Sequence, residues 1–182
     1  VGTILGSEVT RKYANAGLVV SVTVEDFAKA GFTGPLAGIA FQRYWETKTY
    51  ELGGGKFFAP AQRIPDYLAG RVKAPLGGTT YRPGLAHVDL NRLFPEWLTA
   101  SLKQAIKAFD RKMKGFASGE GTLIGIEART STPLRITRDE TLQSVSMKGL
   151  YPGGEGAGYA GGIVSSGIDG LRIAEQICAE LS

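Results

Sequence analysis

A glycine-dense segment near the end of the chain, residues 149–170 (GLYPGGEGAGYAGGIVSSGIDG), constrains the fold more than any other stretch. A short apolar run at residues 147–151 leads into the glycines, and a helical pattern begins at Gly162. Glycine loses more conformational freedom on folding than other residues, so this density indicates positive φ angles or a close approach to the backbone. The segment predicts a strand, a glycine-rich turn and a helix, in that order.

The start of the predicted helix offers free backbone N–H groups and the positive end of a helix dipole, which suit an anionic or carbonyl-bearing ligand. The alternative is a turn whose glycines only pack the helix tightly on a sheet. The phosphate-loop pattern GxxxxGK[ST] is absent, because no lysine follows these glycines. Residues 154–158 (GEGAG) contain GxG, but no second βα unit with a ribose-binding acid follows. The turn therefore looks like the last part of a nucleotide-binding site rather than the first.

Several segments carry a family resemblance. Residues 149–155 (GLYPGGE) resemble the C-terminal flavin-binding motif of the glutathione-reductase-like flavoproteins. Residues 125–139 (GIEARTSTPLRITRD), followed by the glycine segment, resemble the bacterial NAD(FAD)-utilizing dehydrogenase family, as do residues 15–27 and 34–68. This resemblance implies an FAD-dependent oxidoreductase, a small-molecule substrate and NAD(P)H as the candidate electron donor.

The same resemblance implies a cofactor site. Glu155 is expected near the ribityl chain and pyrophosphate of FAD, and the start of the last helix near the N1–C2=O edge of the isoalloxazine ring. The candidate cofactor-binding residues are Gly153, Gly154, Glu155, Gly156, Ala157, Gly161, Gly162, Ile163, Arg129, Thr130 and Ser131. Arg135 and Arg138 form a basic cluster that is either an anion site or solvated surface. No catalytic residue and no metal ligand is assigned.

Proteins of this family begin with a βαβ unit that carries GxGxxG, and no such motif lies near Val1. We therefore expect a fragment of a larger flavoprotein, inactive alone, whose missing partner is the N-terminal FAD-binding part of the same protein. The expected fold class is α/β. An α+β middle region, residues 1–128, precedes the C-terminal strand, turn and helix of a Rossmann-like FAD-binding domain, residues 129–182. The alternative function is a stand-alone binding domain whose glycine turn contacts a partner protein. A hydrolase is disfavoured because no nucleophile–base set is identifiable.

Periodicity predicts the remaining elements. Strands are expected at residues 17–24, 122–128 and 134–137, a helical turn at Glu25 and Asp26, and helices from Pro35 to Gly53, at 64–69 and at 95–114. The helix from Pro35 places Ala37, Phe41, Tyr44, Trp45 and Leu52 on one face, and its terminal glycines are interpreted as a helix end. The helix at 95–114 carries an apolar stripe of Leu98, Leu102, Ala105, Ile106, Phe109 and Met113. The last helix is expected to bury Ile163, Gly167, Gly170, Leu171, Ala174, Cys178 and Leu181.

Composition disfavours a disulfide-stabilised, a nucleic-acid-binding and a membrane-binding protein. With 182 residues, 43% of them hydrophobic, the chain is long enough for one substantial core. The net charge of +4 is concentrated on the helix at 95–114; without interleaved aromatic residues it indicates a solvated face rather than a nucleic-acid or membrane surface. Cys178 is the single cysteine, so no intrachain disulfide forms and a cytoplasmic location is expected. His87, the single histidine, is interpreted as structural. The sequence is compatible with an oligomer as well as with a monomer.

Overall fold

Strand β3 (Ala59–Arg63) forms the centre of a small, open, three-stranded sheet in the computed structural model, which describes residues 2–3, 14–129 and 131–181. It pairs in parallel with β4 (Leu85–His87) and antiparallel with β5 (Thr122–Ile124). Gln62 of β3 is fully buried, and its polar groups are satisfied. Its amide donates to the carbonyl of Arg71 at 2.7 Å, and its side-chain oxygen accepts from the N–H of Leu90 at 2.8 Å. The central strand is therefore buried without an unpaired amide.

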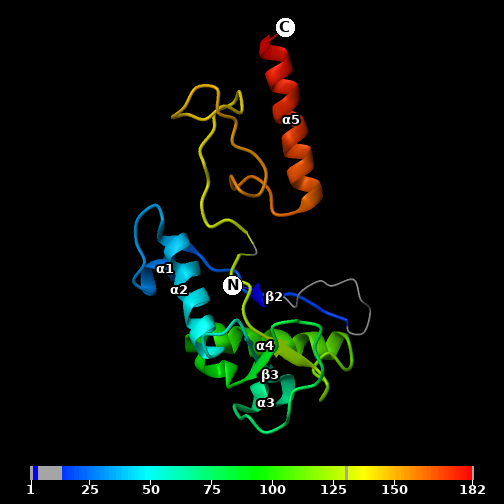
Figure 1. Ribbon diagram of the computed structural model, residues 1–182. Helices are drawn as coiled ribbons and strands as arrows, with labels where there is room; N and C mark the ends of the chain where they lie inside the picture. Colours follow the sequence, from blue (N-terminus) through cyan, green and yellow to red (C-terminus); the bar gives the residue numbers. More distant parts are fainter. Residues whose placement is uncertain (1, 4–13, 130, 182) are drawn as a thin grey trace.

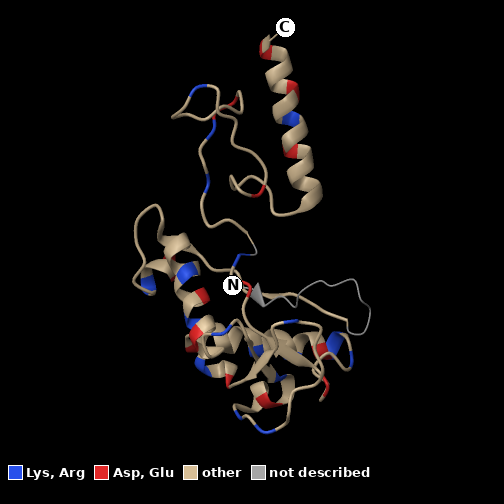
Figure 2. Ribbon diagram, in the orientation of Figure 1, with Lys and Arg blue, Asp and Glu red and all other residues tan. Residues whose placement is uncertain are grey.

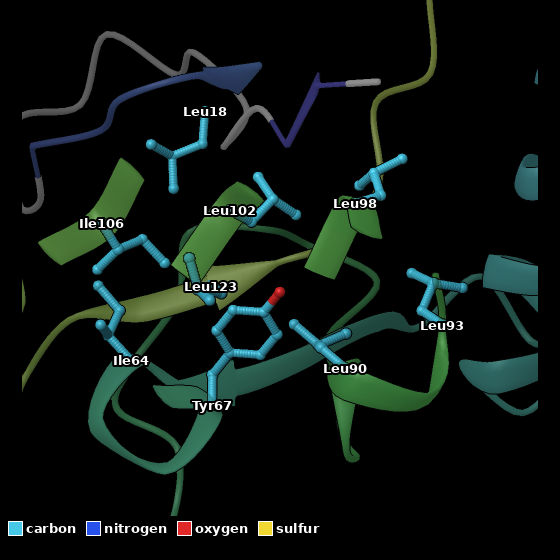
Figure 3. Close-up of a cluster of buried hydrophobic side chains, with 9 residues drawn as sticks. All are labelled: Leu18, Ile64, Tyr67, Leu90, Leu93, Leu98, Leu102, Ile106 and Leu123. Atoms are coloured by element: carbon cyan, nitrogen blue, oxygen red, sulfur yellow. The ribbon is translucent and has the colours of Figure 1, made fainter. Parts of the chain in front are cut away.

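Helix α4 (Glu96–Lys112) packs over this sheet and completes the core (Figure 3). Its inward stripe repeats every four residues, and Leu98 and Ile106 are 0% exposed. The stripe meets side chains from α3 (Ile64–Ala69), β5 and the short 3-10 helix η1 (Leu90–Arg92). The core consists of Leu18, Ile64, Tyr67, Leu90, Leu93, Leu98, Leu102, Ile106 and Leu123. The predicted helices at 64–69 and 95–114 are confirmed, although Phe109 and Met113 at the end of the stripe are exposed.

The basic residues of α4 point mainly to solvent, as expected of a solvated face. Lys107, Arg111 and Lys112 are exposed, as is Lys114 just after the helix, and Figure 2 shows basic and acidic positions interspersed over the body. Lys103 is half-buried, with its Nζ 5.3 Å from the centre of the Tyr67 ring. This cation–π contact anchors the helix to α3.

Helix α2 (Ala37–Leu52) adds an aromatic cluster beside the sheet. Phe41 and Trp45 are buried, with Phe27 of α1 (Val24–Lys29) 5.1 Å from Phe41 and Phe94 5.5 Å from Trp45 between ring centres. The predicted helix is confirmed, but Tyr44 is exposed rather than facing the core. Gly53 ends the helix, and a Cβ there would lie 2.2 Å from the carbonyl oxygen of Phe58. Close packing therefore favours glycine at position 53, and the next residue, Gly54, has a φ of 86°, which favours glycine just after the end of the helix, as predicted.

The strand expected at residues 17–24 is much shorter in the structure. Strand β2 (Leu18–Val19) pairs antiparallel with β1 (Gly2–Thr3). The chain then turns into α1 because Thr23 and Asp26 form a capping box. The N–H of Thr23 donates to Asp26 Oδ2 at 2.9 Å, and the N–H of Asp26 donates to Thr23 Oγ1 at 3.4 Å. This reciprocal cap favours helix over strand from Val24 onward.

After β5 the described chain is irregular over residues 125–129 and 131–162, called the irregular segment below, before helix α5 (Ile163–Leu181) begins. Figure 1 shows this segment and α5 extending away from the sheet. The strands expected at 134–137 and 147–151 are wrong, and β5 ends at Ile124 rather than at residue 128. Around residues 145–149 the backbone forms turns, closed by a bond from the N–H of Ser144 to the carbonyl of Leu150 at 2.7 Å. A strand needs a neighbour for its hydrogen bonds, and no described strand lies beside residues 147–151.

The predicted terminal helix is confirmed as α5, but its predicted burial is wrong. Within the described part of α5, only Asp169 is buried. Ile163, Leu171 and Leu181 are 94%, 66% and 83% exposed. Gly167, Gly170, Ala174 and Cys178 are exposed too. The helix rests on the irregular segment through one side only, so an apolar face lies open to solvent.

No helix in the described parts of the chain has both the length and the hydropathy needed to cross a membrane.

Candidate functional site

The glycine turn, residues 153–162, is the last part of the irregular segment and leads directly into α5 (Figure 1). Two backbone bonds reverse its direction: the N–H of Gly158 donates to the Glu155 carbonyl at 3.0 Å, and the N–H of Tyr159 donates to the Gly154 carbonyl at 3.0 Å. Gly154 and Gly158 have φ angles of 66° and 85°. A side chain is strained at such angles, so these two positions favour glycine.

Part of the turn is filled by the protein itself. A Cβ on Gly153 would lie 2.4 Å from Ile173 Cδ1 of α5, and a Cβ on Gly158 would lie 2.4 Å from the carbonyl oxygen of Leu134. Ala157, between them, is 5% exposed, and its carbonyl accepts from the N–H of Ile136 at 3.1 Å. Tight packing therefore accounts for the small residues at Gly153 and Ala157, and at Gly158 it acts together with the positive φ.

The other half of the turn is open. No heavy atom comes within 4 Å of a Cβ placed on Gly156 or Gly161, and the nearest to one on Gly162 is Ser165 Oγ at 3.7 Å. The N–H groups of Gly161, Gly162 and Ile163 donate to no described group. They stand at the positive end of the α5 dipole, where an anion or a carbonyl oxygen is stabilised. Glu155 is exposed at the rim of the turn.

A buried ion pair joins an earlier part of the irregular segment to α5 beside the start of the glycine turn. Arg138 donates to Asp169 through two bonds, Nη2 to Oδ1 at 2.6 Å and Nη1 to Oδ2 at 3.0 Å. The two side chains are only 11% and 9% exposed. The Arg138 guanidinium and the N–H of Gly154 together lower the pKa of the Asp169 carboxyl to about 2, so the pair is fully charged at neutral pH. Arg138 is thus neither a free anion site nor solvated, contrary to both expectations for it.

Tyr159 completes this arrangement. The Arg138 guanidinium lies 3.7 Å from the centre of the Tyr159 ring, and the exposed Arg135 guanidinium lies 4.9 Å from it. The Tyr159 hydroxyl accepts from the N–H of Arg138 and donates to the carbonyl of Ile136, both at 3.0 Å. Arg135 Nε donates to the carbonyl of Gly158 at 3.0 Å. Only Arg135 of the predicted basic cluster stays at the surface.

Two of the predicted site residues, Arg129 and Ser131, are anchored to α2 rather than to the glycine turn. Arg129 forms a bidentate pair with Glu46, Nε to Oε1 at 2.6 Å and Nη2 to Oε2 at 3.0 Å. The carbonyl of Ser131 accepts from Gln42 Nε2 at 3.2 Å. Thr130 lies outside the described residues. These contacts fix the start of the segment that leads to the glycine turn, and they leave a cofactor role for residues 129–131 as a prediction.

A comparison with known protein families decides the family. The family described as "FAD-dependent protein, C-terminal domain-like" matches residues 6–130, more than half of the chain. The chain belongs to this family. The prediction of an FAD-dependent family is thereby confirmed, while the narrower placement among glutathione-reductase-like flavoproteins stays a prediction. The match ends before the glycine turn, so the family alone assigns no role to that turn.

A longer relative aligns with more of the chain than the family match does. A protein of Clostridium beijerinckii, named only as an uncharacterized protein, is 43% identical over 166 residues, which is 90% of this chain. So long an alignment must include part of the segment after residue 130. The chain spans only 31% of that protein's length.

The open half of the glycine turn fits the cofactor that the family description implies. Free N–H donors at a helix start suit the carbonyl and nitrogen acceptors of a flavin or the oxygens of a pyrophosphate. The lack of neighbouring atoms around Gly156, Gly161 and Gly162 leaves room for a ring or chain to approach the backbone. The Oγ of Ser166, in the first turns of α5, is buried with no hydrogen-bond partner in the described structure, which adds an unused polar group nearby.

The sequence interpretation missed the partnership of Arg138 and Asp169. One signal was present: Asp169 is the single acidic residue among the first twelve residues of α5, IVSSGIDGLRIA, and Arg172 is the only other charged residue among them. A lone carboxylate in such a helix indicates a specific cationic partner, because an unpaired charge is costly to bury.

Proposed function

We propose that this chain supplies the flavin-facing C-terminal part of an FAD-dependent oxidoreductase, as a fragment of a longer protein. The observation that carries the proposal is the open glycine turn, whose N–H groups at the start of α5 have no partner in the described structure. Membership of an FAD-dependent family supports the choice of cofactor. In this proposal residues 1–128 are the middle region, and residues 129–182 are the last segment of a Rossmann-like FAD-binding domain.

The chain's own contribution is binding and electrostatic tuning. The N–H groups of Gly161, Gly162 and Ile163 would donate to the ring edge of FAD, and the helix dipole would stabilise negative charge there. Glu155 would accept hydrogen bonds from cofactor hydroxyls. When bound, FAD supplies the redox chemistry, for which we propose NAD(P)H as electron donor and a small molecule as substrate.

The exposed face of α5 supports a covering partner. Ile163, Val164 and Leu171 are 94%, 75% and 66% exposed, and apolar patches of this kind mark interaction surfaces. The chain spans less than a third of the Clostridium beijerinckii relative, so a longer protein of that kind has ample chain to cover them. We propose that the N-terminal FAD-binding part of the same protein covers α5 and supplies the rest of the cofactor site.

The same exposed face also favours a second candidate function, a non-enzymatic interaction domain. Its apolar residues would then contact a separate protein, and the glycine turn would belong to the contact surface. Flavin absorbance separates the two candidates, because an interaction domain carries no bound FAD in the longer protein.

Replacing Glu155 by alanine tests the binding role directly. In the longer protein we expect weaker FAD binding by about 1 to 3 kcal/mol, the range for hydrogen bonds to a charged group. We expect no change in the free energy of unfolding, because Glu155 is exposed. The measurements are FAD titration of the apo-protein and urea unfolding, with the exposed Glu120→Ala as a matched control outside the turn. Unchanged FAD affinity together with reduced stability would make Glu155 a structural loop residue.

A further inference from the structure

We infer that Arg138 and Asp169 are positioning residues for the flavin site. Their buried ion pair fixes the glycine turn in the conformation that leaves the start of α5 open to the cofactor. The inference rests on the proposed function, and it concerns two residues outside the predicted cofactor-binding set.

The pair ties three segments together at one point. Asp169 belongs to α5, and Arg138 belongs to the irregular segment. Each also binds the backbone that enters the glycine turn: Asp169 Oδ2 accepts from the N–H of Gly154 at 2.8 Å, and Arg138 Nη1 donates to the carbonyl of Pro152 at 2.8 Å. The turn starts at this anchor and ends in the same helix that carries Asp169. Its path is therefore fixed at both ends.

The pair acts through the backbone and does not contact the cofactor. Both oxygens of Asp169 and both terminal nitrogens of Arg138 are already bonded to protein groups. Stacking on Tyr159, whose hydroxyl bonds the Arg138 backbone, holds the guanidinium in place. What the pair determines is the placement of Gly154, and with it the course of the chain to Gly161 and Gly162.

The burial of this ion pair indicates that it orients the glycine turn and α5 rather than adding net stability. Desolvation offsets much of the attraction in a buried ion pair, so such a pair contributes little net stability. The two hydrogen bonds between Arg138 and Asp169, however, form in only one relative orientation of the side chains. Asp169 is the single buried residue of the described part of α5. This contact and a hydrogen bond from the Tyr151 hydroxyl to Glu180, near the other end of the helix, orient α5 without a packed core, as a binding site on its N-terminus requires.

The test uses the longer protein with Arg138→Gln and Arg138→Lys, and Arg71→Gln as a matched control. Arg71 forms another arginine–aspartate pair, Nε to Asp66 Oδ1 at 3.0 Å, in the middle region. The readouts are the FAD dissociation constant, the reduction potential of the bound flavin and the hydrogen-exchange rate of the Gly154 amide. Arg138→Lys keeps the charge but loses the bidentate geometry, and it provides the test if Arg138→Gln does not fold.

We expect Arg138→Gln to weaken FAD binding roughly 10- to 100-fold and to speed Gly154 exchange. Arg138→Lys should restore part of the FAD affinity and part of the protection of the Gly154 amide. Arg71→Gln should change neither quantity. Faster exchange with unchanged FAD affinity and potential would overturn the positioning role, and so would unchanged exchange. If the wild-type protein binds no FAD, the proposed function itself fails, whereas FAD binding that is insensitive to Arg138 removes only this inference.

Discussion

Replacing Gly162 by valine in the longer protein is expected to weaken FAD binding by more than about 100-fold while the protein stays folded. Gly162 immediately precedes α5, and a Cβ there meets nothing closer than Ser165 Oγ at 3.7 Å. Gly162 is not among the positive-φ glycines, unlike Gly154 and Gly158, so a side chain at this position meets no backbone strain. A branched side chain would instead fill the space that the cofactor needs.

Flavin content of the purified protein, from its visible absorbance, measures this effect, and urea unfolding reports the stability. Gly119→Val is the matched control, because Gly119 also has no neighbour within 4 Å and no positive φ, but lies in the middle region. Normal flavin occupancy in Gly162→Val would show that the space before α5 is not occupied by the cofactor.

Replacing Ile106 by alanine is expected to reduce the free energy of unfolding by about 2 to 5 kcal/mol. Ile106 is 0% exposed at the centre of the stripe by which α4 covers the sheet. The truncation removes apolar contacts and leaves a cavity that the neighbouring leucines fill only in part. A loss of this size is a large fraction of the 5 to 15 kcal/mol that typically stabilises a domain.

Val164→Ala in the 182-residue chain is the matched comparison, because Val164 is 75% exposed on α5. Its truncation should change the free energy of unfolding by no more than about 0.5 kcal/mol. Urea unfolding of both variants measures the difference. Equal losses would mean that α5 packs into the same cooperative core as α4.

The sequence predicted best those elements whose stability is local. Helix α4 carries an apolar stripe at helical spacing and ends near Gly115, and the sequence alone located it to within two residues. The strand expected at residues 147–151 failed because a strand is stabilised by a neighbouring strand, and the described chain provides none there. For α5 the same limit applied: periodicity identified the helix, but burial of its apolar face depends on what packs against it, which no local pattern specifies.

Within the candidate site, too, the sequence predicted some features and not others. Glycine density correctly indicated a turn with positive φ angles at Gly154 and Gly158. Composition could not separate glycines that pack against the protein, such as Gly153, from glycines that stay open, such as Gly161, because both uses require the same small residue. Asp169 in its helix indicated a cationic partner, but that this partner is Arg138, 31 positions away in sequence, depends on how α5 packs and not on a local pattern.

Titration of FAD into the 182-residue chain and into the longer protein, followed by flavin absorbance and fluorescence, tests the split cofactor site most directly. We predict one tightly bound FAD per longer protein and a colourless 182-residue chain, because an isolated part of a binding site loses most of its affinity. A stoichiometric yellow complex of the 182-residue chain would contradict the split site. A longer protein that binds no FAD would contradict the proposed function.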